Sequence, residues 1–181
     1  MGALEEPKPV KLFSGLIFKE KEILLSAREK LVKFFGEMDF ESEIFPFDYT
    51  DYYEKEMGKD LKRNFISFYK LVPPNSLPDV KNKTREIEKK LSPEDAGSRT
   101  VNIDPGYLSE ENVVLATTKG YSHRPYLNSG IYAEMTYYYK SESYRVFDWT
   151  YPDFKLPERI EMFHRLRNIY TSQILHYKGR Y

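Results

Sequence analysis

The sequence contains no cysteine in its 181 residues. Disulfide bonds, thiolate nucleophiles and cysteine-ligated metal sites are therefore excluded. Glutamine occurs once, at Gln173, whereas lysine and glutamate are abundant, a bias reported for heat-adapted proteins. No apolar run approaches the length of a membrane-spanning helix, and the N-terminal residues lack the apolar stretch of a signal peptide. We therefore expect a cytoplasmic protein with no membrane partner.

The chain also lacks a net charge, because 28 Lys and Arg residues balance 28 Asp and Glu residues. This balance argues against broad, non-specific attraction to DNA or to an anionic membrane, although it leaves room for a local basic patch. The glycine-rich phosphate loops, the nucleophile elbow and the paired-histidine zinc motif are all absent from the sequence. ATPases with a Walker loop, dinucleotide oxidoreductases, elbow-type hydrolases and zinc proteases are disfavoured accordingly.

Length and patterning predict a single α+β domain at residues 11–181 after a flexible leader at residues 1–10. Apolar periodicity predicts helices at residues 20–35, 79–91 and 157–177, and short apolar runs predict strands at 11–18, 41–47 and 63–72. This order opens a split β-α-β arrangement of the ferredoxin-like kind. We expect a mainly antiparallel sheet with helices packed on one face, the final helix among them.

The second half of the chain carries turn signals between short apolar segments. A strand at residues 101–103 is expected to enter a turn at Asp104-Pro105-Gly106, and Ser109 is expected to cap a helix that carries residues 113–116. Asn128-Ser129-Gly130 predicts a hairpin between residues 124–127 and 131–139. Alternation along 131–139 places Glu134 on one face with Tyr132, Thr136 and Tyr138, opposite Ile131, Ala133, Met135, Tyr137 and Tyr139.

Residues 99–139 concentrate the side chains capable of chemistry. Glu134 is a positioned carboxylate that could act as a base or bind a divalent ion, unless its face of the sheet is simply solvated. Asp104 and Glu134 together would suit Mg²⁺ or Mn²⁺, although a lone Asp-Pro-Gly is also an ordinary turn. The hairpin brings the Arg124 strand beside the Glu134 strand. We therefore predict that Asp104, His123, Arg124 and Glu134 converge on one concave surface.

Lys119, His123 and Arg124 are candidates for binding an anion such as a phosphate or carboxylate, with Tyr132 beside them. His123 could also move a proton near neutral pH. The alternative for Lys119 is that it neutralises a helix C-terminus capped by Gly120. Aromatic and acidic residues at 48–53 and 148–153 suit stacking on a base or sugar, or ordinary loop packing.

Two function classes follow from these residues. The first is an enzyme or binder of a phosphorylated or nucleotide-like anionic ligand with a divalent metal, in which Glu134 and His123 are catalytic. The second is an RNA-binding or protein-interaction module that uses the tyrosine-rich hairpin surface.

Six segments carry a family resemblance: KLFSGLIF, FPFDYTDYYEKEMG, VNIDPGYL, VLATTKGYSHR, GIYAEMT and DWTYPD. Together they resemble the prokaryotic family called domain of unknown function 4416, over residues 11–170 or so. The resemblance implies a single domain of bacteria and archaea, and it implies no particular activity.

Overall fold

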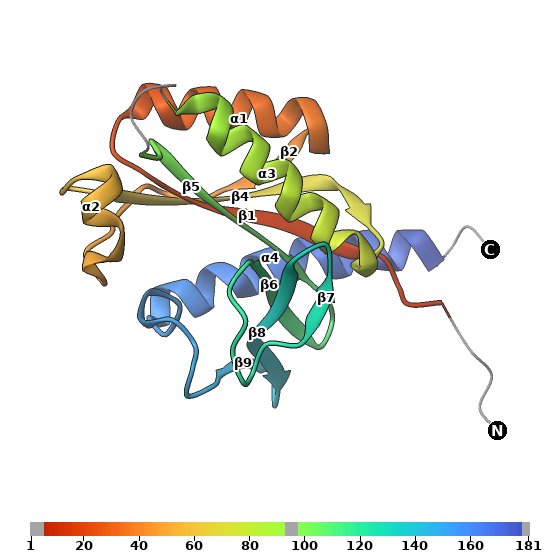
Figure 1. Cartoon of the computed structure of the whole chain (residues 1–181). Coiled ribbons are helices and arrows are strands. Elements are labelled where there is room, and N and C mark those ends of the chain that lie inside the picture. Colours follow the sequence, from red (N-terminus) through yellow and green to blue (C-terminus); the bar gives the residue numbers. More distant parts are fainter. Residues whose placement is uncertain (1–5, 93–97, 179–181) are drawn as a thin grey trace.

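The computed structural model describes residues 6–92 and 98–178. These residues form one nine-stranded, antiparallel sheet together with four α-helices (Figure 1). Seven strands lie side by side in the order β2-β4-β1-β5-β6-β8-β7, while β3 pairs with β4 and β9 pairs with β8. The predicted α+β class and the mainly antiparallel sheet are confirmed.

The first half of the chain has the ferredoxin-like order that the sequence predicted. Strand β1 (Val10–Phe18) leads into α1 (Lys21–Phe35), which ends at Gly36 with φ of 93°. Strand β4 lies between β1 and β2, so that β1-α1-β2 is a split β-α-β unit. The remaining elements of this half are β2 (Met38–Glu41), β3 (Phe45–Pro46), α2 (Glu54–Met57), β4 (Lys62–Val72), α3 (Leu77–Leu91) and β5 (Val101–Leu108).

The second half extends the sheet with β6 (Asn112–Thr117), β7 (Tyr126–Asn128), β8 (Ile131–Lys140) and β9 (Ser143–Val146). The hairpin between β7 and β8 turns at Ser129 and Gly130, both with positive φ, as the Asn-Ser-Gly signal predicted. Helix α4 (Pro157–Lys178) follows and ends the described chain.

Two predictions for residues 104–116 are wrong. Residues 104–106 form no turn, because β5 runs straight through them in register with Ser14 and Gly15 of β1. Residues 113–116 belong to strand β6 rather than to a helix. The Ser109 hydroxyl accepts hydrogen bonds from the backbone N–H groups of Glu111 and Asn112, yet it does so in the turn of a β5–β6 hairpin.

Helices cover both faces of the sheet, which corrects the prediction of one covered face. Helices α1 and α3 pack on one face, where Leu12, Leu16 and Ile103 are buried (Figure 1). Helix α4 packs on the other face through Phe163 and Leu166, so its predicted docking on the sheet is confirmed. Of the predicted leader, residues 1–5 lie outside the described residues, and Val10 already belongs to β1.

A β-bulge in β8 breaks the predicted alternation of faces. Val113 pairs with Tyr137 while Val114 pairs with Met135, so that β8 carries one extra residue at Thr136. Ile131 consequently packs on the α3 side, whereas Tyr137 packs on the α4 side. The bulge thus turns Tyr137 to the face that the alternation had assigned to Glu134.

The sheet opens between β5 and β6, and this opening positions the candidate site. The two strands pair only at Gly106–Leu108 with Val113–Leu115, because Pro105 has no N–H to donate and the strands diverge beyond it. Side chains of α3 form hydrogen bonds with the backbone groups of β5 that β6 leaves unpaired. Glu88 accepts the Ile103 N–H at 2.5 Å, and the Lys81 ammonium donates to the Ile103 carbonyl at 2.9 Å.

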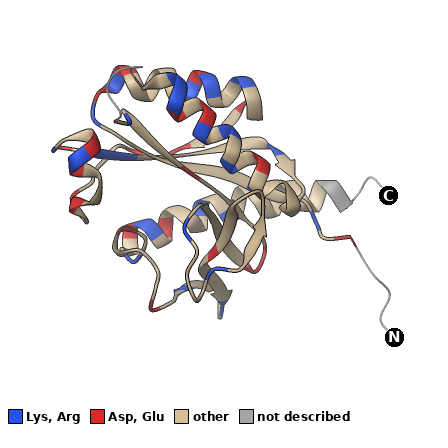
Figure 2. Ribbon diagram, in the orientation of Figure 1, with Lys and Arg blue, Asp and Glu red and all other residues tan. Residues whose placement is uncertain are grey.

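Charges of both signs are distributed over the helices. Lys and Arg are interspersed with Asp and Glu along α1 and α3 (Figure 2). None of the helices in the described part of the chain combines the length and apolar character needed to cross a membrane.

Candidate functional site

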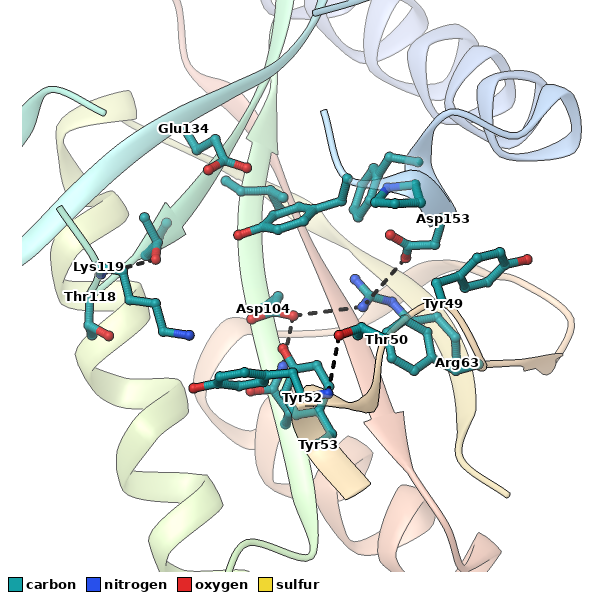
Figure 3. Close-up of a pocket in the computed structure, with 18 of the residues that line it drawn as sticks. Tyr49, Thr50, Tyr52, Tyr53, Arg63, Asp104, Thr118, Lys119, Glu134 and Asp153 are labelled. Carbon is teal, nitrogen blue, oxygen red and sulfur yellow. Dashed lines mark hydrogen bonds and ion pairs between the residues drawn. The ribbon is translucent and has the colours of Figure 1, made fainter. Parts of the chain in front are cut away.

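A cavity of about 500 Å³ lies where β5 and β6 diverge (Figure 3). Its lining comes from β4, β5, α3, the end of β6, β8 and two loops. One loop contributes Phe47, Tyr49, Thr50, Tyr52 and Tyr53, and the other contributes residues 151–154. The volume lies within the range of small-molecule sites in proteins.

Arg63 of β4 is a buried cation in the cavity lining. Its side chain is 4% exposed, and its Nη1 atom lies 3.8 Å from Asp104 Oδ2 and 3.6 Å from Asp153 Oδ2. These distances are too long for hydrogen bonds, and Arg63 donates none to the described residues. The guanidinium is held instead by the rings of Phe47, Phe65 and Phe154, at 4.8–5.6 Å from its carbon atom.

A second buried arginine lies behind the first. Arg159 of α4 has its guanidinium carbon 4.1 Å from the centre of the Phe45 ring, and its Nε donates to the Asp153 carbonyl at 3.4 Å. Burial lowers the pKa of Arg159, and the nearby positive charge of Arg63 lowers it further. The Asp153 carboxylate lies 3.6 Å from Arg63 Nη1, and its charge raises the pKa of Arg159, partly offsetting these two effects.

Asp104 lies on the cavity floor with its side chain 25% exposed. Its Oδ2 accepts a hydrogen bond from Asn102 at 2.7 Å, and its Oδ1 is 3.5 Å from the Lys81 ammonium. Asp104 reaches this position because β5 continues through it as a strand, opposite Gly15 of β1. Neighbouring cations hold the carboxylate without enclosing it.

Glu134 of β8 is 1% exposed and also lines the cavity. Its Oε2 accepts a hydrogen bond from Arg124 Nε and lies 3.4 Å from His123 Nε2. Its Oε1 is buried and accepts no hydrogen bond from the described residues. Arg124 is fixed in turn by the Lys119 carbonyl at 3.1 Å and by the Tyr151 hydroxyl at 2.9 Å. The side chain of Glu134 is thus held rigidly, with one oxygen left unpaired.

A stack of aromatic rings supports His123 from the far side. The imidazole lies 4.8 Å from the Trp149 ring at an interplanar angle of 13°, and Trp149 lies 4.7 Å from the Phe147 ring at 6°. The Trp149 indole N–H also donates to the Met135 carbonyl at 2.9 Å. His123 therefore has little freedom to leave Glu134.

Three tyrosines and one lysine also line the cavity: Tyr52, Tyr53, Tyr151 and Lys119. The Lys119 ammonium lies 3.8 Å from the centre of the Tyr52 ring and forms no ion pair with the described carboxylates (Figure 3). Burial raises the pKa of Tyr53, with a further contribution from Asp104. Burial, followed by the Glu134 charge, raises the pKa of Tyr151 to about 12. Both phenols are therefore neutral near pH 7 and keep their O–H donors.

The structure brings most of the predicted site residues together. Asp104, Lys119 and Glu134 all line the cavity, and Arg124 lies on the same face as Glu134, as the hairpin geometry predicted. His123 and Arg124 lie behind Glu134 rather than on the cavity wall. Tyr132 lies apart from the cavity, with its ring against Gly120 and 5.3 Å from the ring of Tyr126.

The predicted metal site gains little support from these contacts. Within residues 6–92 and 98–178, no three His, Asp or Glu side chains are arranged to hold a metal ion. Asp104 already faces Lys81 and Arg63, and Glu134 faces Arg124. The Mg²⁺ or Mn²⁺ role of these carboxylates stays a prediction.

Arg63 is the main site residue that the sequence analysis missed, because it lies inside a strand among apolar residues. One signal was present. Strand alternation places Arg63 on the same face as Phe65, and a charged residue on an apolar strand face indicates either an ion pair or a site.

A comparison with protein families gives one match, which covers residues 8–170. The matching family is described as Domain of unknown function (DUF4416). The chain belongs to this family. Neither a curated protein nor a solved structure matches the DUF4416 chain significantly. The family has no assigned activity, so the function must be argued from the cavity itself.

Proposed function

We propose that this DUF4416 protein binds a small anionic ligand, of the phosphorylated or nucleotide-like class, in the cavity between β5 and β6. The observation that carries the proposal is Arg63, a buried guanidinium in the cavity lining that donates no hydrogen bond to the described residues. A buried arginine without such bonds is costly, and an anionic ligand would satisfy its donors.

Lys119 would supply a second contact with the anion, across the cavity from Arg63 (Figure 3). Its ammonium rests on the Tyr52 ring and has no acidic partner among the residues described. A point charge on one wall and a planar fork on the other are the two chemical forms that proteins use to bind phosphate. The tyrosines of the 47–53 loop would contact the uncharged part of the ligand.

Glu134 is the candidate for a catalytic base if the protein is an enzyme. Arg124 and His123 would position it, and His123 would accept or return a proton through the 3.4 Å contact with Oε2. If a divalent ion takes part, Asp104 and Glu134 would contact it.

Calorimetric titration with inorganic phosphate and with AMP tests the proposal. We expect Lys119→Met and Arg63→Lys each to weaken binding about tenfold, equivalent to about 1.4 kcal/mol. Arg63→Lys keeps the charge but loses the fork, which limits the risk of unfolding. Arg145→Met, which changes an exposed arginine on β9, is the matched control and should bind like the wild type. If neither probe binds with or without Mg²⁺, the proposal is wrong.

A second candidate function is favoured by the aromatic surface around β8 and β9. Tyr138, Trp149 and Tyr121 are substantially exposed; the Trp149 ring stacks on Phe147, and the Tyr138 ring packs against Phe147 at an angle of 47°. Exposed rings of this kind can stack on the bases of single-stranded RNA. RNA binding predicts a gel shift with mixed single-stranded RNA at low salt, which Trp149→Ala weakens and added salt abolishes. No shift at low salt would remove this candidate.

A further inference from the structure

We infer that the ligand carries hydroxyl groups as well as its anionic group, as a sugar phosphate or the ribose phosphate of a nucleotide does, and that Asp104 accepts a hydrogen bond from one of them. This inference rests on the proposed function. It assigns the carboxylates of the cavity a role in selecting the ligand.

The Asp104 carboxylate has one oxygen that is held and one that is not. Its Oδ2 is occupied by the Asn102 amide at 2.7 Å, whereas Oδ1 receives no hydrogen bond from the described residues. The Lys81 ammonium lies 3.5 Å from Oδ1 but donates to the Ile103 carbonyl at 2.9 Å. Lys81 therefore lies beside Asp104 without donating a hydrogen bond to Oδ1. With a quarter of the side chain exposed to the cavity, Oδ1 is free to accept from a ligand.

Charges of both signs lie together on the cavity floor. Arg63 Nη1 lies 3.8 Å from Asp104 Oδ2, so a donor group and an acceptor group stand side by side. Figure 3 places both around the same cavity, with Glu134 and Asp153 nearby. A simple anion would gain from Arg63 but would leave the acceptor oxygen of Asp104 unused. A ligand with an anionic oxygen and a hydroxyl satisfies both kinds of group.

The buried Oε1 atom of Glu134 is a second unpaired acceptor. This oxygen has no hydrogen-bond partner among the described residues, although Oε2 of the same carboxylate is held by Arg124. A buried unpaired carboxylate oxygen is costly and would gain from a donor. It provides a second acceptor for a hydroxyl at the β8 side of the cavity.

Hydroxyl recognition also fits these carboxylates better than a metal ion does. Each already faces a cation, Lys81 or Arg63 in the case of Asp104 and Arg124 in the case of Glu134. Adding a divalent ion would place it beside these cations, whereas a neutral hydroxyl donor meets no such repulsion.

The test compares ligands that differ only in their hydroxyl groups. Four probes are titrated in buffer containing EDTA: inorganic phosphate, ribose 5-phosphate, AMP and 2′,3′-dideoxy-AMP. We expect AMP to bind at least about tenfold more tightly than its dideoxy analogue, because loss of the hydroxyls leaves a carboxylate unpaired. Ribose 5-phosphate distinguishes the source: affinity equal to that of AMP indicates a sugar phosphate, and weaker affinity indicates a nucleotide.

Variants separate this inference from the proposed function. Asp104→Asn should reduce the preference for AMP over dideoxy-AMP to about twofold or less, whereas Lys119→Met should weaken both nucleotides equally. Asp79→Asn, on the exposed start of α3, is the control and should keep the full preference.

Three results would overturn the inference. Equal binding of AMP and dideoxy-AMP would refute it while leaving the proposed function in place. Binding that EDTA abolishes and Mg²⁺ restores would assign the carboxylates to a metal ion. Failure of all four probes to bind, with or without Mg²⁺, would refute the proposed function itself. The comparison of probes on the wild-type protein needs no variant, so misfolding cannot obscure it.

Discussion

At the scale of single residues, the arginine at the floor of the cavity depends on a glycine in the neighbouring strand. A methyl group added to Gly15 would lie 2.5 Å from Arg63 Nη2 and 3.0 Å from the Phe65 ring. Gly15 thus makes room for the guanidinium, which then lies between aromatic rings where its weak hydration is tolerated. Strand β1 helps to shape the site although Gly15 itself carries no chemistry.

Replacing Gly15 by alanine should therefore affect binding through Arg63. We expect Gly15→Ala to push the guanidinium aside and to weaken binding of the phosphate-bearing probe about tenfold. Its cost in unfolding free energy should stay within about 1–3 kcal/mol, because the far end of a side chain can move. Calorimetric titration and chemical denaturation measure the two effects. Ser14→Ala is the control, because Ser14 shares the face covered by α1 and α3 with Leu12 and Leu16, opposite to Gly15. Full affinity in Gly15→Ala would show that Arg63 does not contact the ligand.

At the scale of elements, segments with a long or clear pattern could be predicted and short ambiguous ones could not. The helices α1, α3 and α4 were predicted within two residues at each end, because their apolar stripes span several turns. Strand β6 was misassigned, since a run of four apolar residues fits either a helix or a buried strand. A serine followed by acidic residues likewise fits either a helix cap or a hairpin turn. Pairing with β5 and β8 decided in favour of the strand.

Helix α4 supplies a prediction about packing between elements. Phe163 is fully buried, with its ring 5.1 Å from Phe13 of β1 and 5.2 Å from Tyr137 of β8. Phe163→Ala should lower the unfolding free energy by about 3–5 kcal/mol, as cavity formation in a core does. Leu175→Ala on the same helix, at a side chain 70% exposed, should cost less than about 0.5 kcal/mol. Urea denaturation of both variants gives the comparison. Similar losses in the two would mean that α4 does not pack as described.

At the scale of the whole molecule, the cavity arises from an incomplete join between two parts of one sheet. In the sheet, strands β1 to β5 are joined to strands β6 to β9 only by the short β5–β6 ladder. Charged side chains of α3 bond to the backbone of β5 where that pairing is missing. Sequence patterns located Asp104, Lys119 and Glu134 because acids and bases stand out among turn residues and strands. They could not locate the opening between the strands, which depends on long-range pairing. Arg63 was missed because it lies inside a strand among apolar residues.

Seven tyrosines with raised pKa values predict how the stability of the whole molecule depends on pH. Desolvation in the folded state is the main cause that raises the pKa of these tyrosines. The pKa rises to about 12 for Tyr151 and Tyr170. It is also raised for Tyr49, Tyr53, Tyr107, Tyr137 and Tyr144. In the unfolded chain these groups ionise near pH 10. Above about pH 10 the folded state therefore holds more protons than the unfolded state, and the unfolding free energy must fall as pH rises.

Buried Lys11 has the opposite effect on stability. Burial lowers its pKa, so below about pH 10.5 the unfolded chain holds more protons than the folded chain, and the unfolding free energy rises with pH. One lysine does not offset seven tyrosines, so we expect a steep loss of stability between about pH 10 and pH 12. Denaturant titrations across this range measure it. Tyr170→Phe should flatten the loss, at a cost of about 1 kcal/mol at neutral pH for the hydrogen bond that its hydroxyl donates to the Pro9 carbonyl. Tyr121→Phe, at a largely exposed ring, should leave the profile unchanged. A stability that holds constant or rises through this range would mean that folding does not raise the pKa of these tyrosines.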